Sequence, residues 1–241
     1  MPSRRKTKLT VGVSIVTGLV IAATISGLAG SLLSNDEFDE SQKTEITEHD
    51  PDSDATGGGW SVELGDWEVH AGNVKEKSDA DVEVSSDYRA MLDAGVSDFA
   101  AKVVLKIEGG DQIWGSVVRH SGPRDWIMAF HDNVGEIVLG KKHPDEDLTG
   151  ATVSIAHPTA GGFQELGRTG AAWGNGQTHS IELEVIGNAI TVYADDVQVL
   201  SAIDDDNMTS TFAGIFSRGD GNNKLESFDV TGIDEEEEEE E

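Results

Sequence analysis

Strict alternation of apolar and acidic side chains marks the stretch Ile181–Val185, which reads Ile-Glu-Leu-Glu-Val. A side-chain period of two residues places one face of a β-strand in a core and the other in water. Two tight turns and two further apolar runs follow, in the order Gly187-Asn188, Ala189–Tyr193, Asp195-Asp196 and Val197–Leu200. Such turn residues favour hairpins. The pattern therefore predicts a three-stranded antiparallel meander with one buried face.

Short β-branched and aromatic runs of the same kind recur through residues 57–233, separated by Gly, Asn and Asp turns at intervals of about 8–12 residues. No helical periodicity long enough for a helix interrupts them. The other expected strands are Phe99–Ile107, Gln112–His120, Trp126–His131, Glu136–Leu139, Ala151–His157, His179–Ile186, Thr211–Ser217 and Leu225–Val230. This organisation predicts an all-β domain, a two-sheet antiparallel jelly-roll sandwich.

The N-terminal region has the charge distribution of a membrane anchor. Residues 1–8 form a basic head, with Arg4, Arg5, Lys6 and Lys8, and the 25 residues from Leu9 to Leu33 carry no charge. A helix needs about 20 apolar residues to cross a bilayer, and basic flanks stay in the cytoplasm. We expect a transmembrane signal-anchor over 9–33, with the rest of the chain outside. Cleavage as a signal peptide is the alternative.

Polar, acidic segments flank the expected domain. Residues 34–56 are predicted to be a disordered acidic stalk, ended by Gly57-Gly58-Gly59. Residues 234–241 form a poly-Glu tail, interpreted as a disordered, solvated end. The folded domain is therefore expected at 57–233.

Net charge and the lack of cysteine exclude several classes of function. The formal net charge is −29, from 46 acidic residues against 17 Lys and Arg. Such a chain repels nucleic acid, and its self-repulsion is screened only in concentrated salt. We therefore predict no nucleic-acid partner and a source adapted to high salt, haloarchaeal or viral. With no Cys, disulfides and Cys-ligated metals are excluded.

Residues Trp60–Ile233 resemble the concanavalin A-like lectin/glucanase superfamily, in its laminin G-like and 3-keto-disaccharide-hydrolase-like branches. The matching segments are Trp60–Val74, Asp98–Val103, Trp114–Arg119, His179–Asp196, Phe212–Phe216 and Leu225–Val230. The resemblance implies a jelly-roll of two antiparallel sheets. One departure from the pattern is Asp196, which stands where these domains have a turn glycine.

No catalytic set emerges from the sequence. Glycosidases of this superfamily carry three alternating acids on one strand, and the nearest match here offers Glu182 and Glu184 but Ile186 at the third place. Two carboxylates on one strand face lie about 6–7 Å apart, which suits a retaining glycosidase. Alternation on a solvent face predicts the same two residues, and this is the interpretation we favour.

Basic and aromatic residues gather in one predicted strand-turn-strand unit, which is the candidate ligand-binding region. They are Arg119, His120, Arg124, Trp126 and His131. The resemblance implies that Arg119 lines the concave sheet. Arginine beside an exposed tryptophan suits sugar rings. The alternative is that the tryptophans belong to the core and Arg119 to a rim ion pair.

An acidic loop, Asp204, Asp205, Asp206 and Asn207, is the candidate calcium site, because calcium takes six to eight oxygen ligands. In so acidic a chain, such clusters also arise for solubility alone. Asn207-Met208-Thr209 is also an N-glycosylation sequon, with Asn207 as the acceptor.

These observations predict a membrane-anchored extracellular β-sandwich module. We expect it to bind a glycan or a protein partner at the surface of a cell or virion, without catalysis. Two alternatives stand beside this hypothesis. One is a glycan-processing enzyme of the 3-keto-disaccharide-hydrolase-like kind, and the other is a purely structural surface component.

Overall fold

A computed structural model describes residues 30–77, 88–108, 113–122, 125–132, 135–142, 163–218 and 224–233. The basic head, residues 9–29 of the expected anchor, Arg124, the expected strand at 151–157 and the acidic tail lie outside these ranges. From Gly30 onward, in the described part of the chain, no helix is long and apolar enough to cross a membrane.

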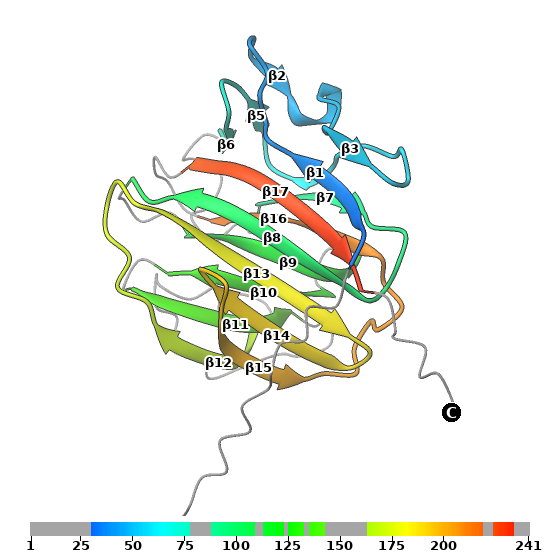
Figure 1. Ribbon diagram of the computed structural model, residues 1–241, viewed down its shortest axis with the longest axis vertical. Helices are drawn as coiled ribbons and strands as arrows, with labels where there is room; N and C mark the ends of the chain where they lie inside the picture. The colour runs from blue at the N-terminus through cyan, green and yellow to red at the C-terminus, as the bar shows by residue number, and fades with distance from the viewer. Residues whose placement is uncertain are drawn as a thin grey trace, which may run out of the picture.

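The described residues form two antiparallel sheets, which stack as the layers of a sandwich (Figure 1). Sheet A follows the order β15 (Val197–Ile203), β14 (Ala189–Ala194), β13 (Thr178–Ile186), β8 (Phe99–Lys106), β17 (Lys224–Gly232), β6 (Val74–Glu76), β5 (Trp67–Val69) and β2 (Thr44–Glu45). Sheet B follows the order β12 (Phe163–Gly170), β11 (Glu136–Lys142), β10 (Asp125–His131), β9 (Ile113–Gly122), β16 (Phe212–Arg218), β7 (Tyr88–Asp93) and β4 (Ser61–Leu64). The expected all-β sandwich is confirmed.

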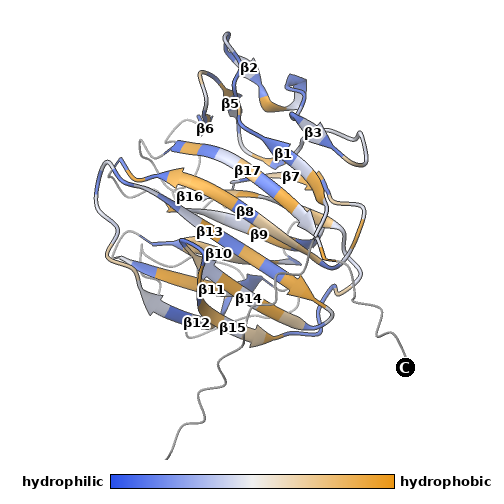
Figure 2. Ribbon diagram, in the orientation of Figure 1, coloured by the Kyte–Doolittle hydropathy of each residue, from blue (hydrophilic) through white to orange (hydrophobic). Residues whose placement is uncertain are grey.

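The predicted meander is present as β13, β14 and β15, paired in sequence order. Its second turn places both Asp195 and Asp196 at positive φ, 49° and 63°. Asp tolerates this left-handed geometry better than most residues, so Asp196 can replace a turn glycine. Figure 2 shows the alternation of apolar and hydrophilic residues along β13.

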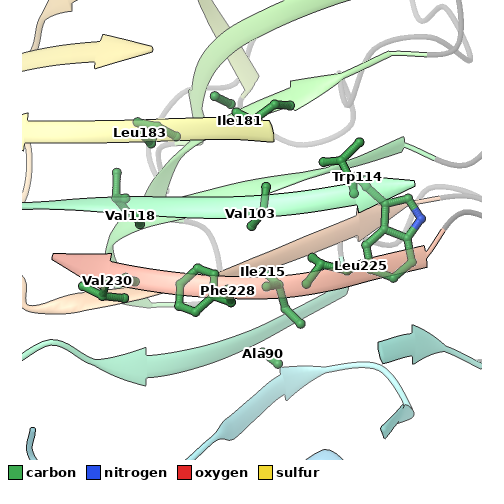
Figure 3. Packing of buried hydrophobic residues seen from close by; sticks show 14 of the residues in the cluster. Ala90, Val103, Trp114, Val118, Ile181, Leu183, Ile215, Leu225, Phe228 and Val230 are labelled. Atoms are coloured by element: carbon green, nitrogen blue, oxygen red, sulfur yellow. The ribbon is translucent and has the colours of Figure 1, made fainter. Parts of the chain in front are cut away.

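The main core lies between the two sheets. Leu183 of β13 and Phe228 of β17 contribute from sheet A, and Trp114 and Val118 of β9 contribute from sheet B. All four side chains are at most 1% exposed. Figure 3 shows side chains from both sheets meeting in this layer.

The expected disordered stalk is wrong, because residues 32–56 are folded onto the sandwich. Strand β1 (Leu32–Asp36) pairs with the last strand, β17, and with β3 (Ser53–Asp54). A short 3-10 helix, η1 (Ile46–Glu48), lies between them in sequence. Phe38 and Ile46, two apolar residues within this polar segment, are 0% and 1% exposed. Burying two large apolar side chains favours order over a solvated chain.

A buried polar cluster holds this N-terminal segment in place. Asp36, which is 0% exposed, accepts hydrogen bonds from Trp60 Nε1 at 2.6 Å and from the Phe38 amide at 2.8 Å. His49 Nε2 lies 2.8 Å from the same carboxylate, and His49 Nδ1 lies 3.2 Å from Glu40 Oε1. The segment therefore packs through specific polar contacts as well as apolar burial.

Candidate binding face on sheet B

The outer face of sheet B, which points away from sheet A, is apolar at its centre. Side chains alternate along each strand, so Trp114 and Val118 face the main core while Val117 and its neighbours face outward. The outward cluster comprises Met91, Ile113, Val117, Trp126, Met128, Phe130, Val138, Phe163 and Phe216. Every member is at most 4% exposed, so the central strands of sheet B are buried on both faces.

Two glycines at the centre of this face lie close against the backbone of neighbouring strands. Gly115 pairs with Phe216 on one side and Phe130 on the other, and Gly214 pairs with Met91. A Cβ at Gly115 would lie 2.0 Å from the Ala129 carbonyl oxygen, so no larger residue fits there. Gly214 is equally confined, because a Cβ there would lie 2.2 Å from the Ala90 carbonyl oxygen.

Arg89 extends over this part of the sheet. It starts on β7, yet its guanidinium carbon lies 3.7 Å from the centroid of the Trp126 ring on β10, with β16 and β9 between the two strands. Lys142 Nζ, from β11, lies 5.2 Å from the same centroid. The His120 ring, from β9, stacks beside Trp126 at 6.2 Å. Four strands thus bring cationic and aromatic groups to one place, named the Trp126 cluster below.

Burial sets the electrostatics of the Trp126 cluster. Arg89 is 3% exposed, and its burial lowers its pKa to about 10 although Glu63 opposes the shift. Burial, followed by the charge of Arg218, lowers the pKa of Lys142 to about 7. Burial also lowers the pKa of His120, against the charge of Glu63. Within this cluster the cationic forms are therefore destabilised relative to the same groups in water.

Carboxylates are displaced to the margins of this face in the described residues. Acidic side chains on sheet B occur at strand ends or in the edge strands, as Glu63, Asp93, Asp125, Glu136 and Glu165. Glu63 Oε2, on edge strand β4, lies 3.8 Å from His120 Nε2. The centre of the face therefore combines apolar and basic groups.

The residues predicted to bind ligand do not lie together in the structure. His120 and Trp126 lie together, but Arg119 is fully buried at φ 53° and leaves the face. Its guanidinium donates to the carbonyl oxygens of Asp204, at 2.8 Å, and Gly187. The expectation that Arg119 lines the concave sheet is wrong, because the positive φ redirects this side chain toward the turns of sheet A.

His131 belongs to a different group at the edge of the sandwich. Its ring stacks on Trp173 at 4.8 Å, and Trp173 stacks on His179 at 4.3 Å. His131 Nε2 also lies 3.2 Å from the Ala171 carbonyl oxygen. This stack ties the loop after β12 to strands of both sheets, and it is separate from the Trp126 cluster.

The predicted calcium loop is neutralised from within the protein. Lys141 Nζ lies 2.5 Å from Asp204 Oδ2 and 2.8 Å from Asp206 Oδ2. Asp205 accepts a hydrogen bond from Asn188 instead. In the described ranges, no three His, Asp or Glu side chains form a group that could hold a metal ion. The expected calcium site is thus not formed, since an ammonium lies where the cation would.

Asn207 lies in the same loop, and its Nδ2 donates to Asp125 Oδ1 at 2.6 Å. This nitrogen is the one that would carry a glycan, so modification requires the bond to Asp125 to break. Glycosylation of the sequon stays a prediction.

Glu182 and Glu184 lie on the outer face of sheet A, away from the Trp126 cluster. Burial raises the pKa of each, with Lys102 opposing the shift at Glu182 and Tyr193 opposing it at Glu184. Tyr193 Oη donates to Glu184 Oε1 at 3.4 Å. Their neighbours on adjacent strands, Lys102 and Tyr193, are polar, which is what a solvent-facing side of the sheet requires and what the alternation indicated.

Comparison with known proteins finds similarity in fold and none in sequence families. No family model matches the sequence, and no curated protein matches it. Among solved structures, the laminarinase from Rhodothermus marinus aligns with TM-score 0.56 and 12% identity, over 86% of this chain and 98% of the enzyme. The exoplasmic/lumenal domain of VIP36, solved with Ca²⁺ and Man3GlcNAc, aligns with TM-score 0.53 and 12% identity, over 76% and 89%.

The GH43 protein BlXynB from Bacillus licheniformis aligns with TM-score 0.57 and 13% identity, over 83% of this chain but only 39% of that protein. At such identities these likenesses establish the fold alone. That fold is a sandwich of two antiparallel sheets, and the matched structures include a laminarinase and a domain solved with Man3GlcNAc. Function must therefore be argued from the side chains.

Three residues of the binding face escaped sequence analysis: Arg89, Lys142 and Arg218. Arg89 lies in β7, a strand that was not expected, and Lys142 and Arg218 each lie at the end of a strand. Basic residues within apolar runs or directly at their ends, in a chain this poor in Lys and Arg, were the available signal.

Proposed function

We propose that this chain is a non-catalytic binding module that recognises a glycan through the outer face of sheet B. The observation that carries the proposal is the Trp126 cluster, in which side chains from β7, β9, β10 and β11 converge. A few convergent polar groups within a largely apolar site are the usual makeup of a small-ligand site. Rigid strands hold these groups in place.

The chemistry of the face supports binding over hydrolysis. Glycosidases position two carboxyl groups about 5–10 Å apart on either side of the scissile bond. Among its described residues, this face instead carries the buried cations Arg89, Lys142 and Arg218, the last two at strand ends. Glu182 and Glu184 lie on the other sheet, and the pKa of both is raised by burial. A glycosidase pair needs unlike environments that keep one group charged and the other protonated.

The proposed setting is the outer surface of a cell or virion in concentrated salt, with the N-terminus in the cytoplasm. Strand β1 begins at Leu32, so the expected anchor must end earlier than Leu33. The uncharged residues Leu9–Ala29 number 21, which is close to the roughly 20 that a spanning helix needs. Because the stalk is folded, the module would lie close to the membrane.

A glycan array screened with the full chain in detergent and concentrated KCl tests this proposal, together with a hydrolysis assay of every glycan retained. We expect retention without release of product, and loss of retention in W126A. Y193A, on the outer face of sheet A, is the matched control and should bind as the unmodified chain does.

Release of product would favour the glycan-processing alternative. If a chain with unchanged thermal unfolding neither retains nor cleaves any glycan, the proposal fails and a structural role takes its place.

A further inference from the structure

Exposed apolar side chains gather at one end of the sandwich. In the described ranges, seven large apolar side chains are exposed. Five of the seven lie at the same end, called the Leu32 end below, and they are Leu32, Val96, Ile203, Met208 and Phe212. Single exposed apolar residues are ordinary on a protein surface, but a group of them commonly marks an interaction site.

Strand register places these five residues together. Leu32 begins β1 beside the end of β17, and antiparallel pairing continues from there through β8, β13 and β14 to the end of β15, which is Ile203. Phe212 begins β16 on sheet B, beside the end of β7. Val96 and Met208 lie in the loops from β7 to β8 and from β15 to β16, which cross between the sheets at this end. Figure 1 shows these strand ends on one side of the molecule.

Several carboxylates at the Leu32 end are engaged within the protein. Asp98 Oδ1 accepts a hydrogen bond from the Gly187 amide at 2.9 Å. Asp204 and Asp206 both pair with Lys141. The apolar side chains beside them face outward, in a chain whose other surfaces are rich in acidic groups. Apolar contact is therefore what this end offers to a partner.

The chain that precedes β1 reaches the sandwich at the same end. The Ser31 carbonyl oxygen accepts a hydrogen bond from the Gly232 amide at 2.9 Å. A Cβ at Gly30 would lie 2.2 Å from the Gly232 carbonyl oxygen, so the backbone here lies close against the end of β17. The connection to the preceding residues is therefore fixed at the Leu32 end.

The length of this connection limits how far the sandwich can stand from a membrane. Residues 9–29 carry no charge, and as a helix these 21 residues would be about 31 Å long, close to the thickness of a hydrocarbon core. Gly30 and Ser31 then remain before β1, and two extended residues span at most about 7 Å. The headgroup layer on each side is about 5–8 Å thick. An anchor over 9–29 therefore brings the Leu32 end to the headgroups.

From these observations we infer that the Leu32 end docks onto the lipid surface of the membrane that holds the anchor. The exposed apolar side chains enter the boundary between headgroups and acyl chains, as the apolar face of an interfacial helix does. They are already exposed, so docking needs no rearrangement of the fold. The strands then run away from the membrane, and the outer faces of both sheets stay clear of it. The inference rests on the proposed membrane setting and not on glycan binding.

A matched pair of labels tests the docking. The chain has no cysteine, so I203C and V197C each provide a single labelling site. Ile203 and Val197 are 67% and 63% exposed and lie at opposite ends of β15, about 20 Å apart. Each variant carries an environment-sensitive fluorophore, and the full chain is reconstituted in phosphatidylcholine vesicles with and without nitroxide-labelled lipid. T209A is added throughout, so that no glycan on Asn207 holds this end away from the bilayer.

We expect the label at Ile203 to shift its emission to the blue on transfer from detergent to vesicles and to be quenched by the nitroxide lipid. The label at Val197 should show neither change, because about 20 Å exceeds the thickness of the headgroup layer. A label on V96C should behave as the one at Ile203 does. Adding I203E should reduce quenching at V96C, whereas V197E, the matched control, should leave it unchanged. Thermal unfolding in detergent checks that the variants fold.

Extraction of the vesicles with alkaline carbonate separates this inference from the anchor itself. A chain that stays in the membrane while no label is quenched overturns the docking and leaves the anchor standing. Equal quenching at Ile203 and Val197 also overturns it, because the module then has no preferred end toward the lipid. A blue shift without quenching places a second copy of the chain, and not lipid, against the Leu32 end. Extraction of the unmodified chain, with no label quenched, defeats both proposals.

Discussion

Arg119 shows how one side chain can connect the two sheets of a sandwich. It is fully buried, and its guanidinium satisfies the carbonyl oxygens of Gly187 and Asp204 at the turns of sheet A. Buried carbonyl groups need such partners, and burial lowers the pKa of Arg119 without removing its charge at neutral pH. The residue that seemed most suited to ligand binding is therefore structural.

The substitution R119M tests this structural role. We expect the free energy of unfolding to fall by about 2–4 kcal/mol, because two buried carbonyl oxygens lose their donor. R168M is the control, since Arg168 forms partly exposed ion pairs with Glu136 and Glu165 and should cost less than about 1 kcal/mol. Chemical denaturation measures both. Equal losses in the two variants would contradict the assignment.

A second prediction at the residue scale concerns Lys141. Its ammonium lies between Asp204 and Asp206, so added Ca²⁺ should neither release heat nor raise the melting temperature of the unmodified chain at constant ionic strength. In K141Q the two carboxylates lose their cation, and weak Ca²⁺ binding should appear. Calorimetric titration compares the two proteins. Binding by the unmodified chain would show that the loop can displace Lys141.

The N-terminal segment, residues 32–56, is the element that changes most between sequence and structure. Its acidic composition predicted a solvated stalk, yet Asp36 and His49 form a buried pair within it, with the partly exposed Glu40 beside His49. Burial alone would lower the pKa of His49, but its hydrogen bonds and charge interactions with Asp36 and Glu40 raise the pKa above 6.5. Burial raises the pKa of Asp36, although His49 and Trp60 oppose the shift.

Docking of this element should therefore depend on pH. A group whose pKa is higher in the folded state stabilises that state below its unfolded pKa and loses the effect as pH rises through the folded value. For His49 the loss begins near pH 6.5 and continues upward. Amide exchange over residues 32–54, corrected for intrinsic rates, should show decreasing protection in this window. H49Q should remove the dependence, and a slope unchanged in H49Q would exclude His49 as its cause.

At the scale of the molecule, the sequence predicted the fold better than it predicted the site. Sheet A strands such as β13 alternate strictly because one face is wet, so their register could be read directly. In β9, Ile113–His120 are all buried, so sheet B strands read as continuous apolar runs. Periodicity cannot distinguish the two faces of such a strand. The outward position of Trp126, and the reach of Arg89 across two intervening strands, could come only from the structure.

Net charge acts on the whole molecule, and it gives the last prediction. With a formal charge of −29, surface carboxylates repel one another in dilute salt, where the Debye length is about 10 Å at 0.1 M, but are screened near 1 M, where it is about 3 Å. The melting temperature should therefore rise steeply over this range of KCl. Ion pairs such as Arg168–Glu136 lose strength over the same range, but 17 Lys and Arg residues can balance only part of the charge of 46 acidic residues. NaCl at equal ionic strength should give the same curve, because screening depends on charge and not on ion identity.

A large difference between the two salts would point instead to specific cation binding by the acidic surface. A melting temperature that does not change with salt would show that self-repulsion is already balanced within the fold.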